Sequence, residues 1–311
     1  MDKQDQPRIA VLIPCHNEEV AIGKVIDDFR AALPSAEIYV FDNCCTDRTA
    51  QIAQERGAVV IREGRKGKGF VVERMLNDIE ADYCVMVDGD DTYDAAGAGR
   101  LLGPVLSGEA DMAVAARMQQ SGPGSFPSLH RTGNHLVRRL INWIFGCKLT
   151  DILSGYRAFN RRVVQRVPVV SSGFEVETEL TIQMLYYRLS IVEVPLAYRG
   201  RPAGSESKLH TLRDGARVLW KVFSLFRAFK PLTFFGGMGL VLLVLGLLCG
   251  LPPINDYIQR SDHYVTHVPL AVLAMGLVLL AAGCIFLGVL LHAINWRFKE
   301  LHNVMTRSRR R

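Results

Sequence analysis

The stretch MVDGDDTYDA, residues 86–95, continues an apolar run and ends in a crowd of carboxylates. Like charges this close together repel one another, so the cluster either faces water as an ordinary loop or holds a cation that relieves the repulsion. The rest of the sequence decides between these two interpretations. The carboxylates belong to Asp88, Asp90, Asp91 and Asp94.

Short β-branched runs alternate with helix-like segments on both sides of this cluster. Residues 18–33 and 47–57 have the apolar spacing of helices, and Thr46 or Asp47 is a natural N-cap for the second. The alternation predicts an α/β fold with a mostly parallel sheet and helices on both of its faces. The expected strands cover residues 9–14, 37–42, 58–63, 82–88, 111–117 and 190–198.

Polar side chains collect where the expected strands end. Open sheets of this kind bind ligands beyond the carboxyl ends of their strands. In this chain those ends carry residues 14–19, Asp42 and Asn43, the aspartate cluster and Arg117. This placement favours a ligand site over a solvated turn for the cluster. A later segment, DILSGYRAFN at residues 151–160, is expected to form a polar loop.

Two long uncharged runs occur in the last third of the chain, at residues 232–251 and 268–291. Each is long enough to cross a hydrocarbon core of about 30 Å as a helix, which favours two membrane spans over buried helices of a soluble protein. The segment 211–230, just ahead of the first run, mixes apolar and basic side chains. That composition favours a helix in the membrane interface over a plain core-packing helix.

The basic residues are distributed unevenly around these runs. Lys and Arg number 37 against 31 Asp and Glu, which gives a formal net charge of +6. The C-terminal segment 297–311 is strongly basic, whereas the connector 252–267 contains one Lys or Arg, Arg260. By the positive-inside rule, the N-terminal region and the C-terminal tail are cytosolic and the connector is outside. A basic tail directly behind a span favours the membrane as its partner, and not nucleic acid.

The expected organisation therefore has three parts. Residues 1–207 form a cytosolic α/β domain, residues 208–230 an amphipathic interface helix, and residues 231–311 a two-span membrane domain with a basic tail. The apolar stretch at the N-terminus is too short for a signal peptide, so we expect the first domain to stay in the cytosol. The prediction is an integral membrane protein of the cell inner membrane or its equivalent.

Five short motifs now point to a family. In combination with two C-terminal spans they resemble the family 2 glycosyltransferases of the GT-A fold, and most of all the polyprenyl-phosphate glycosyltransferases. The resemblance covers nearly the whole chain, from about Ile9 onward. It implies an inverting enzyme that moves a hexose from a nucleotide-diphosphate sugar to a polyprenyl phosphate at the cytosolic membrane face, with a UDP-sugar favoured over GDP-mannose. The motifs are PCHNEE (14–19), FDNCCTDRT (41–49), RKGKG (65–69), VDGDDT (87–92) and DILSGYR (151–157).

The resemblance gives the aspartate cluster a role. Asp88 and Asp90 match the DxD motif, which binds a divalent metal together with the donor diphosphate. Hard carboxylate oxygens suit Mg²⁺ or Mn²⁺. We expect Asp90 to be the direct metal ligand and Asp88 to be shared between the metal and the ribose. Thr92 stands where many relatives carry Gln, which leaves part of the coordination sphere open. Asp91 and Asp94 are expected to be loop or helix-cap carboxylates.

Nucleotide recognition carries over in the same way. Pro14, Asn17 and Glu18 match the PxxNE strand end of the family, and Asp42 matches the acid that contacts the base. A carboxylate can accept a hydrogen bond from uracil N3 or from guanine N1, so Asp42 does not identify the base. Lys68, in the GKG turn, either approaches the donor or is a solvated loop lysine.

The acceptor that the resemblance implies is a charged lipid. A polyprenyl phosphate is anionic near neutral pH, so it attacks without a strong general base but needs basic side chains to hold it beside a negatively charged donor. The expected catalytic residues are Asp88, Asp90, Arg117 and Arg131. The resemblance places acceptor or sugar contacts at Arg117, Arg131, Ser154, Arg157, Glu177 and Lys208.

Three other functions stay open. A processive polysaccharide synthase would carry a QxxRW-like motif and more spans, and the three tryptophans of this chain have no such neighbourhood. Loss of the DxD or PxxNE residues would favour a catalytically silent nucleotide-sugar-binding adaptor, and both motifs are present. A transporter subunit would place ionisable residues inside the spans, and only His292 lies near the end of one. A homo-oligomer through the membrane helices is a further hypothesis.

Overall fold

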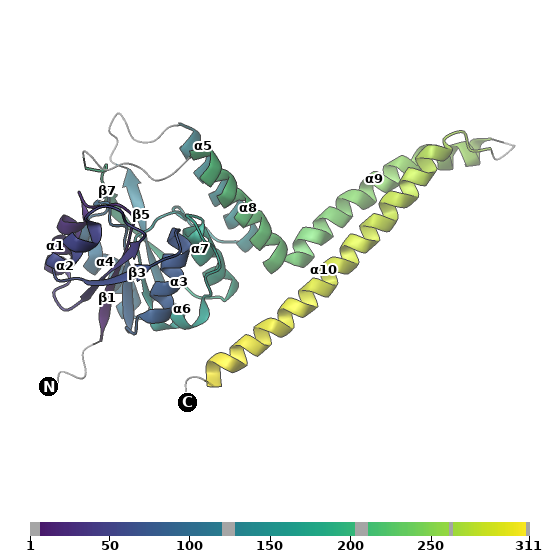
Figure 1. The fold of residues 1–311 in the computed structure, drawn as a ribbon. Coiled ribbons are helices and arrows are strands. Elements are labelled where there is room, and N and C mark those ends of the chain that lie inside the picture. The colour runs from purple at the N-terminus through teal and green to yellow at the C-terminus, as the bar shows by residue number, and fades with distance from the viewer. Residues whose placement is uncertain (1–6, 120–127, 203–210, 261–263, 309–311) are drawn as a thin grey trace. The chain divides into compact units, whose positions relative to one another are not determined.

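The computed structural model describes residues 7–119, 128–202, 211–260 and 264–308 (Figure 1). The chain divides by packing into two compact units, 1–222 and 223–311. This boundary falls inside the segment expected to form the interface helix. The three-part division at residues 207 and 230 stays a prediction.

The N-terminal unit is built on one mixed sheet. Its strands in the described residues are β1 (Ile9–Cys15), β2 (Glu37–Asn43), β3 (Val59–Glu63), β4 (Tyr83–Met86), β5 (Met112–Gln119), β6 (Arg157–Asn160) and β7 (Ile191–Tyr198). Their order across the sheet is β3-β2-β1-β4-β6-β5-β7, and all neighbours are parallel except β6, which is antiparallel to β4 and β5. The prediction of a mostly parallel sheet is confirmed.

Strand β6 differs from the sequence expectation, which made residues 151–160 a polar loop. Phe159 of β6 lies opposite Cys84 of β4 and opposite Met112 of β5. Four residues are too few to display an alternating pattern, so the strand is specified by its burial between two neighbours and not by its own sequence.

Helices cover both faces of this sheet, as predicted (Figure 1). Phe29 and Val11 belong to the hydrophobic core on one face, whereas Met75 and Leu12 belong to the core on the other. Successive residues of β1 thus serve different cores, which is why that strand is a continuous apolar run. The described helices up to residue 229 are α1 (Ile22–Ala32), α2 (Thr49–Glu55), α3 (Lys68–Asp78), the 3₁₀ helix η1 (Ala95–Gly97), α4 (Ala98–Leu106), α5 (Ser128–Phe145), α6 (Arg161–Arg166), α7 (Val176–Tyr186) and α8 (Thr211–Phe229). Neither core includes described residues of α5 or α8, and α8 continues past the unit boundary at residue 222.

The C-terminal unit contains two long helices, α9 (Pro231–Gln259) and α10 (Val268–Ser308), which pack closely as a hairpin. Small residues line their contact. A Cβ atom at Gly239 would lie 2.9 Å from the carbonyl oxygen of Ala281, and one at Gly246 would lie 3.2 Å from that of Ala274. The absent side chains let the two backbones approach, as is common between membrane helices.

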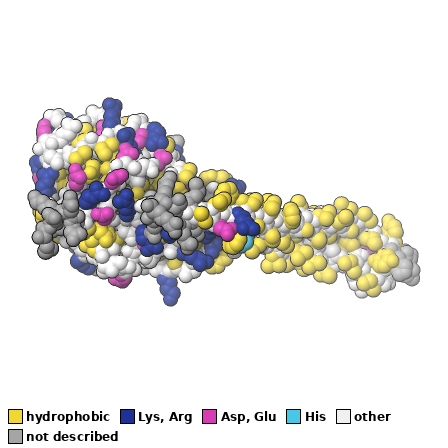
Figure 2. Space-filling view, turned by 90° about the horizontal axis from the view of Figure 1, so that it is seen from below, with side chains coloured by type: hydrophobic (Ala, Val, Ile, Leu, Met, Phe, Trp, Pro, Cys, Tyr) yellow, Lys and Arg dark blue, Asp and Glu magenta, His cyan; other side chains and the backbone are white. Residues whose placement is uncertain are grey.

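Both helices are long and apolar enough to cross a membrane, over Pro231–Gln259 and Val268–Leu301. The predicted spans lie within these ranges. Figure 2 shows hydrophobic side chains over most of the visible face of these helices. Helix α10 continues into the basic C-terminal segment as far as Ser308.

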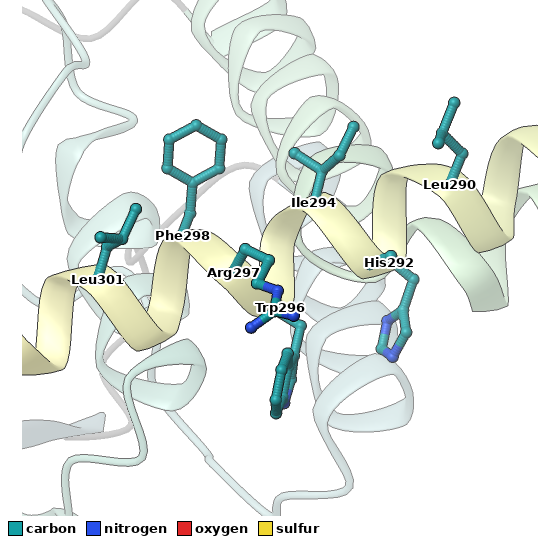
Figure 3. A pocket seen from close by; sticks show the side chains of 8 residues that line it. Leu290, His292, Ile294, Trp296, Arg297, Phe298 and Leu301 are labelled. Atoms are coloured by element: carbon teal, nitrogen blue, oxygen red, sulfur yellow. The ribbon is translucent and has the colours of Figure 1, made fainter.

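A pocket lies along α10 just beyond the end of its uncharged run (Figure 3). Its lining combines apolar side chains with His292 and Arg297, and the Arg297 guanidinium carbon lies 5.3 Å from the ring centre of Trp296. Aromatic and basic side chains are typical of the level where a membrane helix leaves the hydrocarbon. The lining residues are Leu290, His292, Ala293, Ile294, Trp296, Arg297, Phe298 and Leu301.

Candidate functional site

The ends of β1 and β2 are joined through the PxxNE segment. Asn17 has a positive φ of 56°, a conformation that asparagine tolerates better than most residues. Its side-chain oxygen accepts a hydrogen bond from the Thr46 amide at 2.8 Å, and the Thr49 hydroxyl accepts one from the Glu18 amide at 2.8 Å. These contacts fix the first strand end against the loop after the second. Pro14, the first residue of the motif, is buried in β1.

Two polar residues end β2 and are buried there. Asp42 accepts a hydrogen bond from the Cys45 amide at 2.7 Å, which holds its carboxylate at the strand end. Asn43 accepts one from the Gly67 amide at 2.8 Å and donates one to the Arg65 carbonyl at 2.7 Å. Asn43 therefore positions the GKG turn. The sequence placed Asn43 at this edge but gave it no role.

The GKG turn is pressed against a neighbouring backbone segment. Gly67 has φ 143°, and the Gly69 amide donates a hydrogen bond to the Ser172 carbonyl at 3.1 Å. A side chain on either glycine would overlap the carbonyl groups of Ser171 or Ser172. The two glycines are thus required by close backbone approach. These contacts hold the backbone on both sides of Lys68 against the Ser171–Ser172 backbone.

That residue, Lys68, is the centre of an ion-pair cluster. Its ammonium lies 2.5 Å from Asp88 Oδ1 and 2.5 Å from Glu177 Oε1, and its side chain is largely buried. Burial opposes the charged form, but the two carboxylates outweigh it and hold the pKa of Lys68 well above its usual value. Lys68 is therefore not a solvated loop lysine. Glu177, expected at a sugar hydroxyl, is paired with Lys68 here, and its sugar contact stays a prediction.

Asp90 is the more buried member of the DxD pair. Its Oδ1 accepts hydrogen bonds from the Thr92 hydroxyl at 2.5 Å and amide at 3.2 Å, and its Oδ2 lies 2.7 Å from the Arg201 guanidinium. Burial, followed by the charge of Asp88, raises the pKa of Asp90. Arg201 also lies 3.6 Å from Glu18 Oε1, so it links the DxD motif to the PxxNE motif.

The two outer aspartates have structural partners, as expected. Asp91 forms an ion pair with Lys24 at 2.8 Å. Asp94 caps η1 by accepting a hydrogen bond from the Ala96 amide at 3.3 Å. The carboxylates that remain to face a ligand are those of Asp88 and Asp90.

These two carboxylates fit a divalent cation that completes its coordination elsewhere. Within the part of the chain that the structure describes, no three His, Cys, Asp or Glu side chains converge on one point. The described residues therefore offer two hard oxygen donors and no full cage. Mg²⁺ usually keeps several waters and takes further ligands from substrate phosphates, so a two-carboxylate site suits it. In this conformation the ammonium of Lys68 and the guanidinium of Arg201 neutralise the pair.

Arg117, at the end of β5, is held by a bidentate ion pair. Its Nε and Nη2 donate to the two Asp151 oxygens at 2.6 and 2.9 Å, and its guanidinium carbon lies 5.4 Å from the Tyr198 ring centre. Burial opposes its charge, but Asp151 outweighs this effect and raises the pKa of Arg117. Glu193 in turn accepts hydrogen bonds from the backbone amides of Thr150 and Asp151, both at 2.7 Å. Asp151 and Glu193 were not expected from the sequence, although Asp151 opens the DILSGYR motif.

Arg157 lies in the protein interior. It is fully buried, and burial lowers its pKa. Its guanidinium donates to Ser154 O, Thr181 Oγ1, Ile152 O, Glu177 O and, weakly, Met112 Sδ. These five contacts use all of its N–H groups. In this structure Arg157 ties the loop before β6 to α7, and its contact with an acceptor phosphate stays a prediction.

The SGYR loop packs directly on the first aspartate. Ser154 is fully buried, with its hydroxyl 3.4 Å from that of Tyr93, and the Gly155 amide donates to Tyr93 Oη at 3.0 Å. A side chain on Gly155 would overlap the carboxylate of Asp88. The glycine thus lets the loop close on the DxD motif. Tyr93 was not expected at the site, although it follows the motif immediately.

Two predicted site residues cannot be placed by their side chains. Arg131 lies in α5, but its side chain is outside the described residues. Lys208 is outside them altogether. Their acceptor roles, and the catalytic role of Arg131, stay predictions.

Comparison with known proteins decides the family. Residues 10–167, which hold both the PxxNE and the DxD motifs, match the family described as glycosyl transferase family 2. The chain belongs to this family. The family 2 glycosyltransferase is 33% identical to glycosyltransferase AglJ of Haloferax volcanii over 91% of this chain and 92% of the relative. It is 31% identical to a dolichyl-phosphate hexose transferase of the same organism, over 68% of this chain and 90% of the relative.

Solved structures share the fold of the glycosyltransferase. Glucosyl-3-phosphoglycerate synthase from Mycobacterium tuberculosis, in complex with Mn²⁺, UDP and glucosyl-3-phosphoglycerate, superposes with a TM-score of 0.59 at 27% identity. The match covers 70% of this chain and 80% of that one. The GT-A architecture expected from the motifs is confirmed.

Proposed function

We propose that this family 2 glycosyltransferase moves a hexose from a nucleotide-diphosphate sugar, with UDP favoured as the nucleotide, to a polyprenyl phosphate. The observation that carries the proposal is the cluster in which Lys68 and Arg201 pair with Asp88 and Asp90 at the carboxyl edge of the sheet. Such a cluster offers both carboxylates for a cation and cations for a diphosphate. Relatives named as dolichyl-phosphate hexose transferase and undecaprenyl-phosphate mannosyltransferase support a lipid-phosphate acceptor.

The donor half of the reaction follows from these charges. A divalent ion, Mg²⁺ or Mn²⁺, held by Asp88 and Asp90 would offset the charge that builds on the departing nucleoside diphosphate. Lys68 and Arg201 already sit on the two carboxylates and would turn to the diphosphate oxygens when the ion takes their place. Asp42 would accept a hydrogen bond from the base, while Asn17 and Glu18 hold the loop against which the nucleotide lies.

The acceptor half requires no strong base. A phosphate oxygen of the polyprenyl phosphate forms a bond to the anomeric carbon as the bond from that carbon to the nucleotide breaks, and the nucleotide leaves with the electron pair. Attack from the face opposite the leaving group inverts the anomeric centre. Arg117 is oriented by Asp151 and would hold the acceptor phosphate, with Arg131 as the second expected contact.

A membrane location follows from the acceptor and from the C-terminal unit. The two apolar helices would anchor the enzyme, and the basic flanks would place the catalytic unit and the C-terminus in the cytosol. Trp143 of α5 and Trp220 of α8 expose 70% and 68% of their surface. Exposed tryptophans beside basic side chains suit the interface of a bilayer.

The test uses the full-length protein in detergent with a polyprenyl phosphate, Mg²⁺ or Mn²⁺, and a panel of labelled UDP- and GDP-hexoses. Label in the organic phase that depends on the metal and is lost in Asp90→Ala would establish the reaction, and NMR of the product would give its anomeric configuration. Transfer of label to 3-phosphoglycerate, and not to lipid, would show that the proposed polyprenyl phosphate acceptor is wrong. If folded protein transfers no label from any donor, the catalytically silent nucleotide-sugar-binding adaptor becomes the favoured function.

A further inference from the structure

Helix α8 contacts helix α7 through an ion pair with a buried glutamate. Lys221 of α8 places its ammonium 3.1 Å from Oε1 of Glu179 on α7. The Glu179 side chain is only 1% exposed, so its charge depends on this cation and on hydrogen bonds. Its other oxygen, Oε2, accepts the backbone amides of Val170 at 3.1 Å and Ser171 at 2.7 Å. One carboxylate thus joins α8 to the segment 170–172.

The segment 170–172 is the same one that seats the GKG turn. Ser172 accepts the hydrogen bond of the Gly69 amide, and neither Gly67 nor Gly69 has room for a side chain against this backbone. A shift of the segment therefore moves the turn. Lys68, between the two glycines, carries that shift to the carboxylate of Asp88. The contacts are continuous from α8 to the DxD motif, and every residue in them lies in the N-terminal unit.

Helix α8 has two different faces near this contact. Val218 and Val222 are buried, whereas Trp220 is exposed. Lys221 lies at the border, with a side chain 20% exposed. The cation that neutralises Glu179 therefore comes from the helix that the proposed function places at the membrane surface.

We propose that Glu179 is a positioning residue, through which Lys221 of α8 holds the GKG turn in its donor-binding conformation. Neutralising Lys221 leaves Glu179 buried without its cation, so the carboxylate moves towards water and releases the amides of Val170 and Ser171. The GKG turn then loses its support, and nucleotide binding weakens before acceptor binding does. The role of the turn in binding the donor rests on the proposed function.

The test compares four variants of the full-length protein in detergent. Lys221→Met removes the cation and keeps the aliphatic stem, Lys221→Arg keeps the charge, and Glu179→Gln keeps an oxygen for the two amides but removes the ion pair. Arg227→Met removes a cation from an exposed position of the same helix. Hydrogen exchange is measured over residues 66–76, which include the Gly69 amide, and binding of UDP and of GDP with Mn²⁺ is measured by calorimetry.

We expect faster exchange over residues 66–76 in Lys221→Met and a nucleotide dissociation constant raised about 5-fold or more, the usual scale of coupling between sites. Lys221→Arg restores both values, Glu179→Gln gives a smaller effect, and Arg227→Met matches the wild type. The proposal is overturned if exchange in this segment is unchanged in Lys221→Met, or if exchange rises equally throughout the unit. The exchange readout needs no nucleotide or acceptor, so it still decides the proposal if no sugar transfer is found.

Discussion

The ammonium of Lys68 lies 2.5 Å from the Asp88 carboxylate, at a turn whose two glycines pack directly against the backbone of Ser171 and Ser172. The same ammonium neutralises Glu177, which is almost completely buried. A single ammonium thus pairs with Asp88, which is expected to bind the donor and metal, and with Glu177, which is buried in α7. Lys68 is consequently both a support for the fold and a charge for the site.

Replacement of Lys68 by methionine should therefore impair both stability and binding. Removal of one partner from a buried pair costs about 3 kcal/mol or more, because the remaining charge is left uncompensated. Thermal unfolding and titration with UDP or GDP would measure the two losses. Lys66→Met, at an exposed position two residues earlier, is the matched control. Equal behaviour of the two variants would contradict the central place given to Lys68.

Asp90→Asn should separate activity from stability. We expect a loss of transfer of at least about 100-fold, because the expected metal ligand is lost. The pKa of Asp90 is raised in the folded protein, so the folded state binds the proton more tightly than the unfolded state, and the ionised carboxylate costs stability at neutral pH. The variant should unfold at the same or a higher temperature than the wild type at pH 7.

The advantage of Asp90→Asn should shrink as the pH falls. Asp90 of the wild type becomes protonated as the pH drops through its raised pKa towards the ordinary value of 3.8, which removes the cost of its charge. Melting temperatures of both proteins measured from about pH 7.5 down to about pH 4.5 would show the trend. A variant that is less stable than the wild type at every pH would show that the contacts of Asp90 with Thr92 and Arg201 outweigh its desolvation.

Gly155→Ala tests the close packing of the SGYR loop on the DxD motif. The new methyl group would overlap the Asp88 carboxylate, so that either the loop or the carboxylate must shift. We expect the free energy of unfolding to fall by about 1–3 kcal/mol. We also expect kcat/KM to fall, because the Asp88 carboxylate is displaced. Gly99→Ala is the control, since a Cβ there meets no atom within 4 Å. Activity retained in Gly155→Ala would mean that the position of Asp88 matters less than its charge.

Gly246→Leu tests the packing of the two apolar helices. A Cβ at Gly246 already lies 3.0 Å from Val278 Cγ2, so a larger side chain must push α9 and α10 apart. Thermal unfolding in detergent, followed by circular dichroism, should show that the free energy of unfolding is lower by about 1–3 kcal/mol. Gly276→Leu, at a position with no atom within 4 Å of a Cβ, should be neutral. The same loss in both variants would contradict the packing explanation, because leucine favours a helix more than glycine does and Gly276 has no close neighbour.

The sequence predicted those parts of the fold that have a periodic pattern. The parallel strands end in polar residues, and Asp88 with Asp90 follows the apolar run of β4 as expected. Strand β6 was missed because its four residues carry no pattern of their own. For the same reason Asp151, in the loop before that strand, was not paired with Arg117. Contacts that join segments far apart in the sequence leave no local signal.

Burial all round a helix leaves no one-sided pattern in the sequence. Glu177 and Glu179 are two positions apart, and residues at that spacing do not share a helix face. The structure buries both, because α7 is enclosed on every side from Val176 to Met184. Arg157 shows a related limit, since a motif arginine can satisfy the backbone as well as a phosphate. Only the packing distinguishes the two.

The reversed direction of β6 has a consequence for how this site can vary. Other loops at the ligand edge leave the ends of strands, whereas the loop that carries Gly155 enters the beginning of one. The expected nucleotide contacts at Asn17, Glu18 and Asp42 therefore lie where chain leaves β1 and β2, whereas the expected acceptor contact at Ser154 lies where chain arrives at β6. Because β6 pairs with β4 and Gly155 packs on Asp88, this arriving loop is held against the DxD motif. We expect insertions between β5 and β6 to be tolerated only where they leave that contact in place.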